Sequence, residues 1–153
     1  YLLDNDIKEK GEYQLTNALE NMKQKGIAFT PGKVTEWLDC GNKDATVYTN
    51  QRVLEFEKGK ATLKGKNSVT ENSTIIEPCF IGDNVIITNS IVGPHVSIGA
   101  GCKITDAILK NSIIQANTKL SGTFISNSMI GEGAEVKGKA LDISMSDYTT
   151  VSL

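Results

Sequence analysis

Ile98-Gly99-Ala100-Gly101-Cys102 is one copy of a short phrase that recurs between Ile75 and Leu141. Each copy has an apolar residue, then glycine or a polar residue, then two residues typical of turns, then a small or apolar residue. A fixed short period is the signature of a repeat fold, in which each unit stacks on the next. The other clear copies are Ile81-Gly82-Asp83-Asn84-Val85, Val92-Gly93-Pro94-His95-Val96 and Ile130-Gly131-Glu132-Gly133-Ala134, and looser copies begin at Ile104 and Ile114.

The apolar residues of the repeat fall into three columns, whose successive members are 16 or 17 residues apart. This spacing predicts a triangular coil whose sides are short parallel strands, stacked about 4.8 Å apart with the apolar columns inside. Asn, Ser, Thr and Gly lie mostly between the columns, where corners need unusual backbone angles. The columns are Ile81, Ile98, Ile114 and Ile130; Ile87, Ile104, Leu120 and Val136; and Ile76, Val92, Leu109, Ile125 and Leu141.

An antiparallel meander of short strands is the alternative, and it explains alternation but not three columns in step. The pattern resembles that of the hexapeptide-repeat proteins, and the resemblance implies a left-handed parallel β-helix. The predicted fold class is therefore mainly β, with this β-helix preceded by a small α/β piece. Such a fold says little about function, because one fold hosts many activities.

The composition limits the function classes. The formal net charge of −2 over 153 residues gives no electrostatic case for binding nucleic acid. No apolar run approaches the roughly 18 residues that a membrane span requires, and the first residues lack the pattern of a signal peptide. The chain has no initiating methionine, so we expect it to begin inside a longer protein.

The three cysteines, Cys40, Cys79 and Cys102, show no C-x-x-C spacing, and their odd number argues against a disulfide framework. Cys102 falls at an inward-facing position of the coil. A reduced core thiol is the expected reading, and it fits a cytoplasmic protein.

The residues before the repeat predict two helices, near 12–25 and 44–57, and two short strands, at 27–29 and 34–38. These elements would form a poor core by themselves. We therefore divide the chain into 1–57, the last piece of an α/β domain; 58–74, a connector; 75–141, the β-helix; and 142–153, a tail or cap.

Two phrases in the front piece resemble the closing segments of the sugar-1-phosphate nucleotidyltransferases. One is Gly11-Glu12-Tyr13-Gln14-Leu15-Thr16-Asn17-Ala18, and the other is Trp37-Leu38-Asp39-Cys40-Gly41. In that family a Gly-Glu phrase opens a helix, a Trp-x-Asp-x-Gly phrase follows about twenty residues later, and longer members add a hexapeptide β-helix. The order in this chain is the same, although Asn17 replaces the usual Asp.

The resemblance implies site residues. Asp39 lies where the family has a carboxylate that binds the catalytic Mg²⁺, and a hard cation prefers such oxygen ligands; the alternative is a turn residue ahead of Gly41. Lys10 and Glu12 fall near the edge of the sugar-phosphate pocket, or else in a solvated charged loop. Trp37 is expected to pack in a core and only secondarily to form a pocket wall.

The family's glycine-rich nucleotide loop is absent from this sequence, so no catalytic residue is assigned in it. The resemblance implies the C-terminal part of a sugar-nucleotide pyrophosphorylase, with a nucleoside triphosphate and a sugar 1-phosphate as substrates of the whole enzyme. The chain alone should be inactive, and the β-helix should support a homo-oligomer.

Two alternatives stay open. A hexapeptide-repeat acyltransferase would use a histidine as general base, and His95, the single histidine, falls in a coil corner where a solvated side chain is the plainer reading. A purely architectural coil would only assemble subunits.

Overall fold

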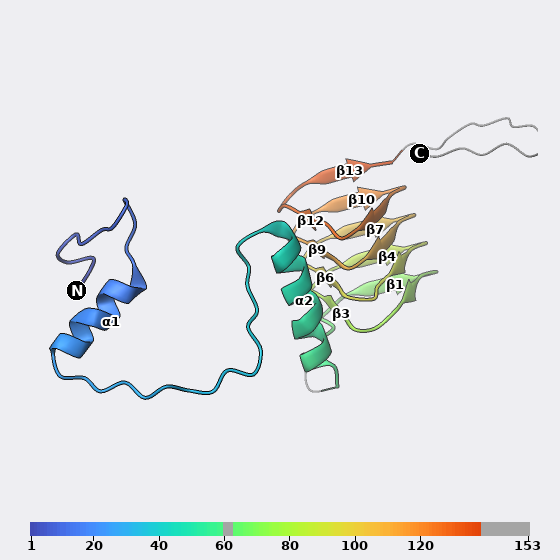
Figure 1. The fold of residues 1–153 in the computed structure, drawn as a ribbon. Helices are drawn as coiled ribbons and strands as arrows, with labels where there is room; N and C mark the ends of the chain where they lie inside the picture. The colour runs from blue at the N-terminus through green and yellow to red at the C-terminus, as the bar shows by residue number, and fades with distance from the viewer. Residues whose placement is uncertain (60–62, 139–153) are drawn as a thin grey trace, which may run out of the picture. The chain divides into compact units, whose positions relative to one another are not determined.

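The computed structural model describes residues 1–59 and 63–138. The chain divides into two compact units, Tyr1–Trp37 and Leu38–Leu153. The second unit contains helix α2 (Lys43–Glu57) and a parallel β-solenoid, whose strands stack in successive coils (Figure 1). The predicted coil is therefore confirmed, and the antiparallel meander is wrong.

The solenoid has three sides, each a parallel sheet formed by one strand from every coil. The five-stranded sheet contains β1 (Val69–Glu71), β4 (Ile86–Thr88), β7 (Lys103–Thr105), β10 (Lys119–Ser121) and β13 (Glu135–Lys137). The second sheet contains β2 (Thr74–Ile75), β5 (Ile91–Val92), β8 (Ile108–Lys110) and β11 (Phe124–Ser126). The third contains β3 (Cys79–Ile81), β6 (Val96–Ile98), β9 (Ser112–Ile114) and β12 (Met129–Ile130).

The strand register confirms the first two apolar columns. Ile81, Ile98, Ile114 and Ile130 are aligned on successive strands, as are Ile87, Ile104, Leu120 and Val136. Side chains that alternate in a strand point to opposite faces, so these columns fill the inside of the coil. Ile98, Ile104 and Ile114 are exposed by at most 1%.

The third column needs one correction. Its members Val92, Leu109 and Ile125 are aligned, but the residue below them is Ile75, not Ile76. Ile76 is 43% exposed. The step from the first coil to the second is 17 residues here, and a register shift of one moves a side chain to the other face. Leu141, the last predicted member, lies outside the described residues.

The corners use left-handed backbone angles, as the sequence predicts. Most are occupied by asparagine, which tolerates a positive φ better than other residues with a side chain. Side-chain amides bond from coil to coil, as between Asn72 and Asn89 (2.8 Å) and between Asn111 and Asn127 (2.7 Å). Corner residues with positive φ include Asn67, Asn72, Asn84, Asn89, His95, Asp106, Asn111, Asn117 and Asn127.

The coils begin before Ile75. Strand β1 already pairs with β4, and Lys64 forms an isolated parallel bridge to Ile81. Much of the segment 58–74 is therefore the first coil. The four-part division of the sequence stays a prediction, while the compact units separate between Trp37 and Leu38.

The buried thiols agree with the prediction for Cys102. Cys79 and Cys102 are free and exposed by at most 2%, while Cys40 is free and exposed. Burial raises the pKa of both buried thiols, which keeps them protonated and unreactive.

The first unit contains helix α1 (Leu15–Gln24), which is shorter than the predicted 12–25. The helix begins later because Glu12 lies in a turn, where the backbone of Glu12 pairs with that of Glu9. The two predicted strands are wrong, since residues 27–38 form neither helix nor strand. A strand needs a neighbour for its backbone groups, and these residues have none within the described chain.

The first unit has no buried residue and therefore no core of its own. Its helix exposes a stripe of apolar side chains, with Leu15 at 74%, Leu19 at 41% and Met22 at 38%.

Candidate functional site

Lys10 lies at the tip of a tight turn in the first unit. The N–H of Glu9 donates to the carbonyl oxygen of Glu12 (2.9 Å), and the N–H of Glu12 donates back (3.1 Å). Lys10 and Gly11 lie between them with φ of 53° and 84°. Two successive positive φ angles are typical of a type I′ turn, so the Gly-Glu phrase builds a two-residue hairpin that exposes the lysine.

Glu12 and Trp37, the other predicted substrate residues, are also exposed. The Nε2 of Gln14 lies 3.5 Å from Glu12 Oε2, at the limit of a hydrogen bond. Trp37 is 82% exposed, so it packs in no core among the described residues. Lys10, Glu12 and Trp37 belong to the first unit, and Asp39 belongs to the second.

Asp39 forms a local turn with its own side chain. Its Oδ1 accepts the backbone N–H of Cys40 (2.8 Å) and of Gly41 (3.2 Å). Helix α2 holds this segment, because the hydroxyl of Thr49 donates to the carbonyl oxygen of Asp39 (2.6 Å) and that of Thr46 to the carbonyl oxygen of Cys40 (3.2 Å). The phrase therefore folds as a fixed, exposed turn in front of α2.

The second carboxylate oxygen of Asp39 is left open by Gly41. A Cβ at position 41 would lie 3.1 Å from Oδ2, closer than an ordinary contact. With Oδ1 taken by two N–H donors, Oδ2 is the oxygen that could reach a cation. One open carboxylate oxygen fits Mg²⁺, which usually takes only one or two protein carboxylates and keeps several waters. Among the described residues there is no group of three or more His, Cys, Asp or Glu side chains that could hold a metal ion.

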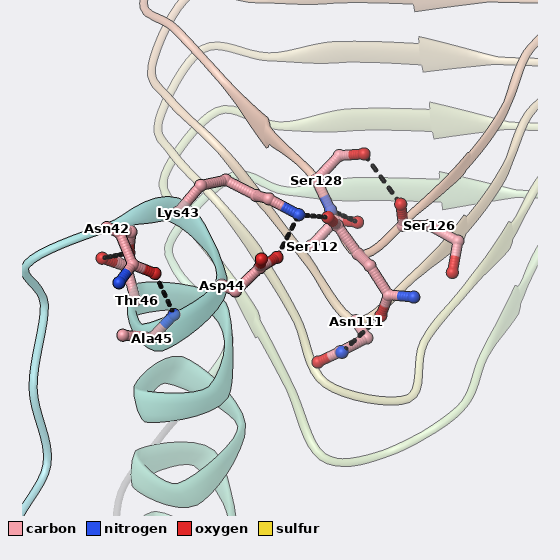
Figure 2. Close-up of polar contacts among 10 residues, drawn as sticks. Asn42, Lys43, Asp44, Ala45, Thr46, Asn111, Ser112, Ser126 and Ser128 are labelled. Atoms are coloured by element: carbon pink, nitrogen blue, oxygen red, sulfur yellow. Dashed lines mark hydrogen bonds and ion pairs between the residues drawn. The ribbon is translucent and has the colours of Figure 1, made fainter.

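Helix α2 begins with a side-chain cap. Asn42 Oδ1 accepts the N–H of Ala45 (2.9 Å), and the hydroxyl of Thr46 donates to the carbonyl oxygen of Asn42 (2.8 Å), as Figure 2 shows. Such a cap satisfies a backbone donor that the first turn leaves free. Asp44 in the first turn also suits the positive end of the helix.

The helix lies along the sheet of β3, β6, β9 and β12 (Figure 1). Its residues Val47 and Leu54 are 3% exposed. Lys43 Nζ donates to the carbonyl oxygen of Asn127 (3.0 Å) beside its ion pair with Asp44 (Figure 2), and Ser97 donates to Asn50 Oδ1 (2.6 Å). These contacts fix α2, and with it the turn of Asp39, to the coils.

His95 also contributes to the contact between α2 and the coils. Its Nε2 lies 2.6 Å from Glu55 Oε1, and its side chain is 17% exposed. The corner position is confirmed, but the imidazole is paired rather than solvated. Sequence reasoning missed Glu55, because nothing in a pattern links residues 40 positions apart. Within the described part of the chain, the pairing gives His95 a structural role and nothing favours the acyltransferase alternative.

Glu55→Gln is expected to lower the unfolding temperature slightly at neutral pH, because the carboxylate that bonds to His95 is replaced by a neutral amide. The hydrogen bond to His95 lowers the pKa of Glu55 below its ordinary value of 4.5. The carboxylate therefore stabilises the fold above about pH 4.5, and this contribution is lost as the pH falls through the lower pKa. Thermal unfolding followed by circular dichroism should show a small difference between wild type and variant at pH 6, and the difference should shrink as the pH falls below 4.5. Glu71→Gln, on β1, is the control; a difference that does not depend on pH would contradict a role for the charge.

No helix among the described residues has the length and apolar character to cross a membrane.

No protein-family model matches the sequence. Individual relatives do match. The chain is 29% identical to a glucose-1-phosphate thymidylyltransferase of Streptomyces antibioticus, over 83% of this chain and 40% of the relative. It is 25% identical to the bifunctional protein GlmU of Latilactobacillus sakei, over 93% of this chain and 34% of the relative. It is 33% identical to a probable mannose-1-phosphate guanyltransferase of Schizosaccharomyces pombe, over 58% of this chain and 21% of the relative.

The chain spans about 40% of the length of the thymidylyltransferases that it matches. An alignment over 83% of the chain is too long for either compact unit alone, so it includes residues of both. Over most of its length, the chain is thus a distant relative of the sugar-1-phosphate nucleotidyltransferases.

Proposed function

We propose that the chain is the C-terminal part of an enzyme that transfers a nucleotidyl group from a nucleoside triphosphate to a sugar 1-phosphate and releases pyrophosphate. The observation that carries the proposal is the similarity to nucleotidyltransferases across both compact units. A likeness limited to the coils would indicate only a shared solenoid.

The exposed apolar residues of the first unit support the same proposal. The stripe on α1 and the side chain of Trp37 have no cover within the unit. Large apolar side chains gathered in one small unit are typical of a surface that packs against something else. In the proposed enzyme, the preceding part of the α/β domain covers them.

In this proposal Asp39 holds the Mg²⁺ through its open Oδ2. When bound, the ion would neutralise negative charge as the sugar phosphate attacks the α-phosphate. Gly41 keeps the approach to Oδ2 clear, and α2 keeps the turn in place. Lys10, at the tip of its hairpin, would meet phosphate as a point charge, while Glu12 and Trp37 border the sugar phosphate.

The coils would serve assembly of the enzyme as a homo-oligomer. A cytoplasmic location is part of the proposal, since all three cysteines are free.

The test is pyrophosphate release by the full-length protein with Mg²⁺, across the common nucleoside triphosphates and several sugar 1-phosphates. We expect turnover with at least one pair and none from the 153-residue chain alone. Reactions without sugar phosphate control for hydrolysis. Absence of release with every pair would overturn the proposal, and transfer from acetyl-CoA would favour the acyltransferase alternative.

A further inference from the structure

The outer surface of the sheet formed by β2, β5, β8 and β11 carries a line of apolar side chains. Ile91, Ile108 and Phe124 occupy the same outward position on successive strands, and Thr74 occupies it on β2. The three apolar side chains are 42%, 45% and 72% exposed. These four residues are called the Phe124 face below.

The other two outer surfaces of the coil differ. Helix α2 lies along the sheet of β3, β6, β9 and β12. The five-stranded sheet has Val69 and Ile86 at the equivalent position of its first two strands, followed by Lys103, Lys119 and Glu135. Within residues 63–138, the Phe124 face is therefore the outer surface that stays apolar across successive coils without a helix over it.

We propose that the Phe124 face pairs with the same face of a second copy of this chain, with the two coils antiparallel. The outward side chains increase in size from one coil to the next, from Thr74 to Phe124. In an antiparallel pair Phe124 lies against Thr74 of the partner subunit, and Ile91 lies against Ile108 of the partner subunit. Each level then holds a similar volume, as close packing requires. A parallel pair would place Phe124 against Phe124 of the partner subunit and leave a gap at the threonines.

Charge fits the same arrangement. Lys110 lies two residues beyond Ile108 on β8, and the equivalent residue one coil below is Gly93. In the antiparallel pair Lys110 lies against Gly93 of the partner subunit, where no side chain obstructs it. One coil further the equivalent residue is Ile76 of the partner subunit, and Glu77 of the partner subunit follows it directly in the chain. The Glu77 carboxylate is exposed and held by the N–H of Cys79 (2.9 Å), so it offers a fixed opposite charge.

The contact is small. Four coils at about 4.8 Å spacing make a face about 20 Å long. A face of this length that carries one row of apolar side chains buries less area than the roughly 800 Å² per partner of a standard interface. We therefore expect a weak, concentration-dependent dimer with two-fold symmetry, which closes and does not grow into a fibre. This pairing rests on the assembly role proposed above and names the surface that performs it.

Ile108→Lys and Ile86→Lys are a matched pair of variants. Both isoleucines begin a strand, point outward and are 45% and 41% exposed. Lysine already occupies the Ile86 position on β7 and β10, so the coil accepts it. Analytical ultracentrifugation from about 10 µM to 1 mM, a range that resolves weak dimers, should show a wild-type dimer. Ile86→Lys should leave its dissociation constant unchanged, and Ile108→Lys should raise it at least tenfold. A monomer at 1 mM, or equal effects of the two lysines, would overturn the pairing.

Thiol cross-linking tests the orientation without a charged variant. Facing sheets lie about 10 Å apart, beyond the roughly 7 Å between Cα atoms that a direct disulfide can span, so a short bis-maleimide is used. In a Cys40→Ser background it should link Thr74→Cys to Phe124→Cys in a mixture of the two proteins, while each alone should link little. Linking of Phe124→Cys to itself would overturn the antiparallel arrangement. If an earlier part of the protein covers the face, no mixture links, and the pairing is overturned. Pyrophosphate release is measured separately, so loss of the dimer alone leaves the proposed chemistry standing.

Discussion

Ile114→Asp is expected to abolish folding of the coils. Ile114 is 1% exposed and stands between Ile98 and Ile130 in a continuous apolar column. The change removes a packed isoleucine and places a carboxyl group where no water and no cation can meet it. The combined cost is roughly 5 kcal/mol or more, which is comparable with the whole stability of an ordinary domain, about 5–15 kcal/mol.

The effect should spread along the solenoid, because each coil is stabilised by its neighbours. Circular dichroism should show loss of β structure at 25 °C, and size-exclusion chromatography should show an expanded or aggregated chain. Ile86→Asp is the control, since its side chain is 41% exposed on the outer surface of β4. An Ile114→Asp protein with unchanged thermal unfolding would contradict the assignment of the column.

The coil could be predicted because each of its turns repeats the same pattern of residues. An inward apolar residue recurs on each side, and asparagine or glycine recurs at corners with positive φ. The error at Ile76 shows the limit of this reasoning. Two isoleucines stand side by side, both 16 or 17 residues from Val92, and only the strand pairing shows that Ile75 points inward.

The position of α2 could not be predicted in this way. Only Val47 and Leu54 are buried on a helix that also exposes Tyr48, Val53 and Phe56. Its place on the coil depends on single polar contacts with distant residues, such as Asn50 with Ser97. No periodic pattern encodes such contacts.

The candidate site was predicted only through a resemblance. The phrase around Asp39 indicated a carboxylate at a turn, and the structure adds which oxygen the turn uses and which it leaves open. The strands predicted at 27–29 and 34–38 fail for a different reason. A strand depends on the sheet that receives it, and the described chain holds no such sheet for these residues.

If the proposed function is right, Asp39→Asn should lower kcat of the full-length protein by about two orders of magnitude or more, because a carboxylate that held Mg²⁺ would stabilise charge that develops in the transition state. The structure shows that Asp39→Asn is a more specific test than Asp39→Ala. The Oδ1 of Asp39 accepts two backbone N–H groups, and the amide oxygen of asparagine can accept the same bonds. Asp39→Asn therefore keeps the turn and removes the negative charge, whereas Asp39→Ala removes both.

The two variants separate the possible roles of Asp39 in an assay of pyrophosphate release with Mg²⁺ at several concentrations. If Asp39 binds the metal, both variants lose activity, and more Mg²⁺ restores little of it. Asp44→Asn is the control, because it removes an exposed carboxylate from the first turn of α2, five residues further along the chain. Its kcat should stay close to that of the wild type. If Asp39→Asn is nearly as active as the wild type and only Asp39→Ala is impaired, Asp39 acts through its turn, and its assignment to the metal is wrong.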